Sequence, residues 1–189
     1  KHASQIGIDV LKNGGNAIDA AIAVGFALSV TFPNAGNLGG GGFMVIRTSS
    51  GEVRTIDFRE VAPENAFRDM YLDENGDVIS GMSLYTAHAS GVPGTVAGFE
   101  YAHERFGTKS WNYLLRPSIQ LATNGFELSF RDAMYLNASR SFFLRDKESA
   151  KIFAAQDNYS VGDLFIQKDL AKTLRRISIG GADEFYKGV

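Results

Sequence analysis

The sequence predicts a mixed α/β fold that is rich in helix and contains one β-hairpin. An almost wholly apolar run at residues 20–30 follows a helix-capping signal, and its length suits a core helix. Residues 43–48 and 53–58 are rich in β-branched and aromatic side chains, and a turn-forming Ser-Ser-Gly-Glu cluster separates them. Helical periodicity returns from residue 95 onward.

Two helices are expected before the hairpin. Apolar residues recur at helical spacing over residues 3–11, and the glycine pair at 14–15 ends the first helix. Asn16 can cap the second helix, with Asp19 as its reciprocal partner three residues later. The apolar run that follows is shorter than the ~20 residues of a membrane span and is stopped by Pro33. We therefore expect a helix that is buried on all sides.

Four consecutive glycines, at residues 39–42, precede the hairpin. A phosphate-binding loop needs a strand before its glycines and a helix after them, whereas this order is reversed. We interpret the glycines as a tight helix-to-strand turn packed against another chain segment, in preference to a loop that binds a ligand directly.

The second strand of the hairpin leads into an Arg-Glu pair. Strand alternation places Ile56 and Phe58 on one face, and Thr55, Asp57 and Arg59 on the other. The planar guanidinium of an arginine suits a carboxylate held by two parallel hydrogen bonds, as a site for an amino-acid-like substrate requires. The spacing alone favours a simpler interpretation, in which Arg59 forms an ion pair with Asp57.

The chain beyond the hairpin predicts turns followed by helices. Residues 73–76 predict a tight turn, and residues 91–94 predict a type II turn before a helix that opens at Thr95. Ser110 caps a segment that we expect Pro117 to divide into two short helices. Further helices are expected at residues 130–139, 168–179 and 182–186.

Composition excludes several classes of function. The chain has 189 residues, of which 44% are hydrophobic and 12% aromatic, as expected for one globular domain with a real core. A net charge of −2 and scattered cationic residues leave no basic stripe, so we expect no nucleic-acid partner. The absence of cysteine excludes disulfides and thiol chemistry, and the three histidines lack metal-ligand spacing, so no metal is expected.

Two other groups of polar residues could suggest a catalytic serine or a calcium site, but neither matches the required pattern. His88 and Ser90 are close in sequence, but the Gly-x-Ser-x-Gly nucleophile elbow is absent, so we interpret both as loop residues. Asp73, Glu74 and Asp77 lack the calcium-loop pattern with its closing Glu, and a solvated turn is the better interpretation.

Five long motifs follow one another in a fixed order: GGNAIDAAIAVGFALSV, PNAGNLGGGGFMVIR, IDFREVAP, ASGVPGTVAGFE and DEFYKG. In this order and spacing they resemble the large-subunit region of γ-glutamyltranspeptidases, also called glutathione hydrolases. The resemblance covers residues 1–189 as a single segment and implies the helix-rich, large-subunit portion of an N-terminal nucleophile hydrolase with an αββα sandwich. The small subunit is absent. Because the chain starts at Lys1 without a leader, we expect a processed or excised piece.

The resemblance also implies the role of single residues. Arg59 matches the arginine of the family's Phe-Arg-Glu motif, which holds the α-carboxylate of the γ-glutamyl group, and this reverses the preference from spacing. Glu60 matches the acid beside it and is expected to be a supporting residue. No catalytic residue is expected in this chain, because the nucleophilic Thr begins the small subunit and Thr86-Ala87-His88 mimics its surroundings only superficially. The chain alone should be inactive.

The implied activity is cleavage of γ-glutamyl amides such as glutathione through a γ-glutamyl-enzyme, with transfer of the glutamyl group to water or an amino acid. Such chemistry needs no metal or organic cofactor. The implied partner is a small subunit cut from the same self-processing precursor, and the implied location is periplasmic or extracellular. A cephalosporin acylase, a poly-γ-glutamate depolymerase and a binding or scaffold fragment without a nucleophile remain alternatives, which the small-subunit sequence would separate.

Overall fold

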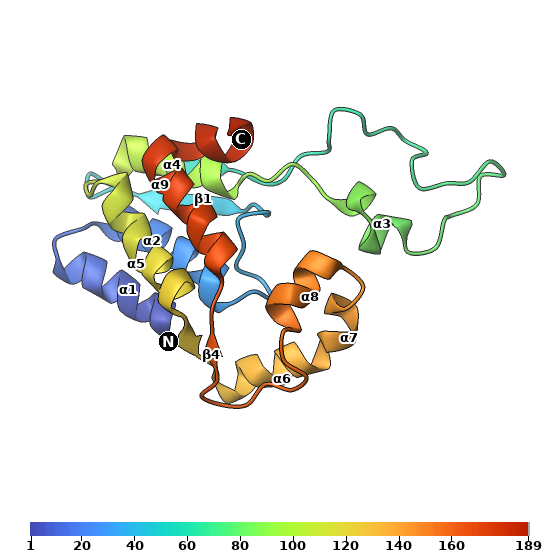
Figure 1. The fold of residues 1–189 in the computed structure, drawn as a ribbon. Coiled ribbons are helices and arrows are strands. Elements are labelled where there is room, and N and C mark those ends of the chain that lie inside the picture. The colour runs from blue at the N-terminus through green and yellow to red at the C-terminus, as the bar shows by residue number, and fades with distance from the viewer. Residues whose placement is uncertain (189) are drawn as a thin grey trace. The chain divides into compact units, whose positions relative to one another are not determined.

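A computed structural model describes residues 1–188 of the chain (Figure 1). The chain divides into two compact units, one made of Lys1–Asn37 and the chain from Ala102 onward, the other of Leu38–Tyr101. No helix within the described residues is both long and apolar enough to cross a membrane. The elements are α1 (His2–Lys12), α2 (Ala17–Thr31), β1 (Phe43–Arg47), β2 (Val53–Asp57), α3 (Met82–Tyr85), the 3-10 turn η1 (Ala87–Ala89), α4 (Thr95–Phe106), α5 (Trp111–Asn124), β3 (Phe126–Glu127), α6 (Phe130–Ala138), α7 (Arg140–Phe143), α8 (Lys147–Phe153), β4 (Leu164–Phe165) and α9 (Lys168–Lys187).

The first unit is built around α2. This helix packs against α1 and α5, and α5 packs in turn against α9. The predicted capping box is confirmed: the Asn16 side chain accepts the Asp19 N–H at 2.9 Å, and the Asp19 carboxylate accepts the Asn16 N–H at 2.8 Å. Burial on all sides is wrong, since Ala21 is exposed and Val24 is half-buried. The fully buried large apolar side chains of this core are Ile22, Phe26, Val30, Leu114, Leu115, Leu174 and Ile177.

Two helices in this unit test the predicted breaks. α5 continues through Pro117, so the predicted division is wrong. Leu114, Leu115 and Ala122 lie fully buried around the proline, and this packing stabilises the helix despite the lost backbone hydrogen bond. α9 does bend where two helices were predicted, because Gly181 has a left-handed φ of 69°.

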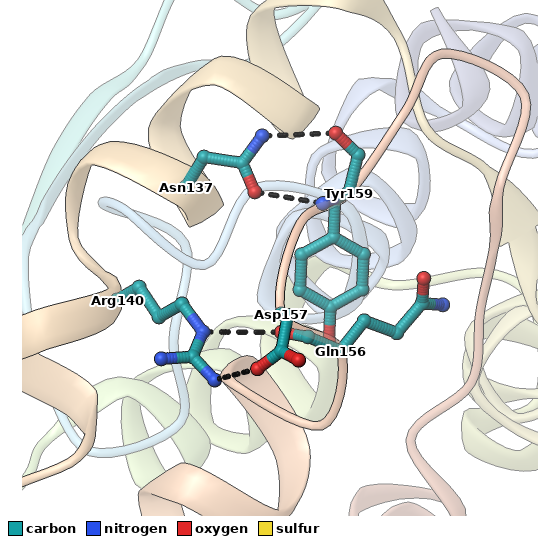
Figure 2. A network of polar contacts seen from close by, with 5 residues as sticks. All are labelled: Asn137, Arg140, Gln156, Asp157 and Tyr159. Atoms are coloured by element: carbon teal, nitrogen blue, oxygen red, sulfur yellow. Dashed lines mark hydrogen bonds and ion pairs between the residues drawn. The ribbon is translucent and has the colours of Figure 1, made fainter.

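A side-chain clamp holds the loop between α8 and β4 (Figure 2). The Asn137 amide donates to the Tyr159 carbonyl at 2.9 Å and accepts the Tyr159 N–H at 2.8 Å. The Arg140 guanidinium donates to the Gln156 carbonyl at 3.2 Å and forms an ion pair of 2.6 Å with Asp157. The Asn137 side chain of α6 therefore bonds both the N–H and the carbonyl group of Tyr159.

The second unit contains the predicted hairpin. β1 and β2 pair antiparallel, with Val45 opposite Thr55 and Phe43 opposite Asp57. Between β2 and α4 the chain makes a long excursion whose only helical elements, among the described residues, are α3 and η1 (Figure 1). Within it, the predicted turn at residues 73–76 is confirmed: the Gly76 N–H bonds the Asp73 carbonyl at 3.0 Å.

Candidate functional site

Arg59 and Glu60 lie just after the end of β2, where the chain leaves the hairpin. Beyond the last paired residue of β2, the Phe58 N–H still bonds the Gly42 carbonyl at 3.0 Å. Three residues later, Val61 pairs with Val92 through bonds of 3.2 and 2.8 Å. The backbone that carries Arg59 is therefore anchored on both sides. As alternation predicted, Ile56 is buried and Phe58 half-buried, while Thr55, Asp57 and Arg59 are exposed.

Glycines flank this anchored backbone. A β-carbon on Gly41 would lie 2.8 Å from the Glu60 nitrogen and 2.9 Å from the Arg59 Cα, and one on Gly94 would clash with the Phe58 carbonyl. The N–H of Gly94 also donates to the Gly40 carbonyl at 2.8 Å. The interpretation of the glycine run as tight packing against another segment is thus confirmed. Gly94 has no left-handed φ, so the type II turn predicted at residues 91–94 is wrong.

An open groove of about 710 Å³ lies beside Arg59 and Glu60. His88 and Ser90, which the sequence placed in an unremarkable loop, line the same groove. The Tyr71 hydroxyl donates to the His88 carbonyl at 2.8 Å and so ties two parts of the excursion together. The full lining is Gly39, Arg59, Glu60, Val61, Ala62, Pro63, Ala66, Met70, Tyr71, His88, Ala89, Ser90 and Gly91.

No local sequence signal could have placed His88 and Ser90 in this groove. Their approach to Arg59 depends on the pairing of Val61 with Val92, which are far apart in the sequence. Neither strand propensity nor turn composition specifies such an isolated bridge, because both describe neighbouring residues only. The sequence therefore singled out Arg59 and Glu60, which line the groove, but not the residues on its opposite side.

The Arg59 guanidinium has no ion pair or hydrogen bond with any residue that the structure describes. The Asp57 carboxylate accepts the backbone N–H of Arg59 at 3.0 Å instead of bonding its side chain. The ion pair that the spacing favoured is therefore not formed. An unpaired guanidinium beside an open groove can bind an anionic group by donating two parallel hydrogen bonds to it.

Glu60 contributes a second charge to the groove. Its Cβ would lie 3.1 Å from a β-carbon on Gly91, so the side chain begins against the opposite segment. Among residues 1–188, no cluster of three or more His, Asp or Glu side chains could hold a metal ion. The groove thus offers one guanidinium and one carboxylate for recognition of charge, beside the polar residues Tyr71, His88 and Ser90.

The family model described as gamma-glutamyltranspeptidase matches residues 3–189. The chain belongs to the gamma-glutamyltranspeptidase family. The resemblance drawn from the motifs is therefore confirmed.

Individual gamma-glutamyltranspeptidase relatives agree with this assignment. A glutathione hydrolase proenzyme of Pseudomonas sp. (strain A14) is 51% identical, over 98% of this chain and 33% of the relative. One of Escherichia coli (strain K12) is 48% identical, over 98% of this chain and 32% of the relative. The crystal structure of Helicobacter pylori gamma-glutamyltranspeptidase superposes with a TM-score of 0.96 at 50% identity, covering 99% of this chain and 54% of that one.

These relatives confirm the predicted fold class. The described chain has the helix-rich fold with a β-hairpin of the corresponding part of a gamma-glutamyltranspeptidase, an N-terminal nucleophile hydrolase. The chain spans about a third of the length of the curated relatives it matches. Its assignment to the large subunit, and the roles of Arg59 and Glu60, stay predictions.

Proposed function

We propose that the protein containing this chain is a γ-glutamyltransferase and glutathione hydrolase in which Arg59 holds the α-carboxylate of the γ-glutamyl group. The observation that carries the proposal is the Arg59 guanidinium beside the groove, which no carboxylate of the described chain neutralises. Family membership and relatives named glutathione hydrolase support the substrate class. Glu60 is a supporting residue at the same strand exit.

The chemistry divides between this chain and the rest of the protein. A Thr hydroxyl outside the chain, activated by its own free α-amine, attacks the γ-amide carbonyl, and the amine of the substrate leaves. Water or an amino acid then takes the γ-glutamyl group from the enzyme. Arg59 supplies positioning through a bidentate contact, and no step needs a metal or an organic cofactor.

In the complete protein, a small subunit cut from the same precursor carries this Thr. The word proenzyme in the names of the relatives supports such processing. The complete protein is periplasmic or extracellular, as the resemblance implies. Fractionation of cells that make the complete protein tests the location.

Substitution of Arg59 in the complete, processed protein tests the role of the guanidinium. A carboxylate contact made equally in the ground state and the transition state contributes uniform binding, so Arg59→Ala should raise KM more than it lowers kcat. The expected loss is about 2–4 kcal/mol, or roughly thirty- to a thousandfold in kcat/KM. Arg59→Lys keeps the positive charge but lacks the planar guanidinium that donates two parallel hydrogen bonds, so it should recover only part of the affinity.

Arg54 provides a matched control on the same hairpin. Its guanidinium is exposed and pairs with Glu52, away from the groove, so Arg54→Ala should leave KM for a chromogenic γ-glutamyl anilide unchanged. An unchanged KM in Arg59→Ala would end the carboxylate-binding role. A complete protein that releases no anilide at all would favour the alternative of a scaffold without a nucleophile.

A further inference from the structure

Asp57 makes one contact that bears directly on Arg59. The antiparallel ladder ends at Phe58, whose N–H bonds the Gly42 carbonyl at 3.0 Å. The next N–H, that of Arg59, faces away from β1, because successive N–H groups of a strand point to opposite sides, and it donates to the Asp57 Oδ1 at 3.0 Å. A side chain that bonds the backbone two residues later fixes the direction in which the chain leaves the strand.

The same contact keeps the two opposite charges apart. Asp57 and Arg59 share a strand face, and a relaxed pair of such side chains would form an exposed ion pair. The Asp57 carboxylate bonds the backbone instead, and no described residue neutralises the guanidinium. Gly41 and Gly94 limit where the backbone can lie, but they contain no group that bonds the Arg59 N–H.

We propose that Asp57 is a positioning residue that directs Arg59 toward the groove by accepting its backbone N–H. The inference rests on the proposed function, in which Arg59 binds the substrate carboxylate. Asp57 acts through Arg59 and does not line the groove itself. What matters is an acceptor oxygen at this position, and the negative charge is dispensable.

The expected effect follows from the population of binding-competent conformers. Without the Asp57 oxygen, the Arg59 N–H bonds water and the strand exit samples more directions, so a smaller fraction of molecules presents the guanidinium to the substrate. In the complete, processed protein, Asp57→Ala should raise KM about three- to tenfold and leave kcat nearly unchanged. Asp57→Asn retains the acceptor oxygen and should keep KM within about twofold of wild type.

A double mutant shows whether Asp57 acts through Arg59. When Arg59→Ala already removes the guanidinium, Asp57→Ala should raise KM no further. Asp73 is a matched control, because its carboxylate accepts the Asn75 N–H at 2.9 Å in the same type of turn outside the groove lining. Asp73→Ala should leave KM unchanged. If Asp57→Ala does not accumulate, Asp57→Ser carries the test, since its hydroxyl bonds the same N–H more weakly and should give an intermediate KM.

The outcomes separate this inference from the proposed function. An unchanged KM in Arg59→Ala overturns the proposed function itself. A raised KM in Arg59→Ala with an unchanged KM in Asp57→Ala overturns only the positioning role. Equal KM values in Asp57→Asn and Asp57→Ala would also overturn it, because they would show that the charge acts and not the acceptor oxygen. A further rise in KM in the double mutant would show that Asp57 acts independently of Arg59.

Discussion

Asp19 is a fully buried carboxylate that holds together two segments distant in sequence. It accepts N–H groups from Asn16, Thr108 and Lys109 at 2.8, 2.9 and 3.2 Å, and the Thr108 hydroxyl at 2.5 Å. Asp19→Ala would leave several donors without partners, and should lower the free energy of unfolding by about 2–4 kcal/mol. Denaturant unfolding of the dilute 189-residue chain, followed by fluorescence of its single tryptophan, Trp111, measures this. An Asp19→Ala chain as stable as wild type would contradict it.

The same carboxylate makes stability depend on pH. Burial acts to raise the pKa of Asp19, but hydrogen bonds from Thr108, Asn16 and Lys109 outweigh it and hold the pKa below its ordinary value of 3.8. Its stabilisation is therefore complete above 3.8 and is lost as the pH falls through the lower pKa of the folded state. The stability difference between wild type and Asp19→Asn should shrink over this acidic range. A constant difference would show that ionisation is irrelevant.

At the scale of elements, the Asn137 clamp should determine the order of the loop between α8 and β4. Asn137→Ala removes both of its bonds to the Tyr159 backbone and should destabilise this loop by about 2 kcal/mol, since the N–H loses its partner and the carbonyl keeps only a 3.4 Å bond from the Asn158 amide. Hydrogen exchange of the Tyr159 amide measures the change. Asp157→Ala is the control: this carboxylate is fully exposed, so loss of its ion pair with Arg140 should leave exchange nearly unchanged. Equal exchange in both variants would contradict the clamp.

Elements specified by neighbouring residues were predictable. The Asn16 and Asp19 capping box, the hairpin and the bend at Gly181 each depend on local chemistry, and the structure contains all three. The break at Pro117 failed because buried packing around it outweighs the local cost. The groove was half predictable for the same reason: Arg59 follows a strand with a clear pattern, whereas the residues opposite depend on a long-range bridge.

At the scale of the whole molecule, the hairpin leaves three large apolar side chains uncovered on one face, beside Arg47, Thr55 and Asp57. Phe43, Val45 and Val53 are 65%, 74% and 58% exposed, and they share one face of a two-stranded sheet. The isolated 189-residue chain should therefore self-associate, because apolar strand surface in water pairs with other copies. Light scattering over a concentration series measures this. Val45→Lys should shift the chain toward monomer, whereas Ile179→Lys, which adds the same charge elsewhere, should not.

A monomer of the wild-type chain with a cooperative, high melting temperature would contradict this expectation. Equal effects of the two lysine substitutions would indicate a general effect of charge on solubility. Because the chain covers only 33% of the Pseudomonas relative, the same face is available to the remaining part of a longer protein. In a longer protein, burial of this face by another segment should stabilise the hairpin.

The glycine packing around Arg59 has a consequence for protein engineering. Gly41 and Gly94 leave no room for a β-carbon next to the backbone of residues 58–60. The position of the Arg59 backbone, and so of its guanidinium, therefore depends on the absence of side chains at these two residues. Substitution of either glycine should displace the backbone of Arg59 and so weaken binding of every substrate. A library intended to broaden the accepted amides should hold both glycines constant and diversify Met70, which also lines the groove.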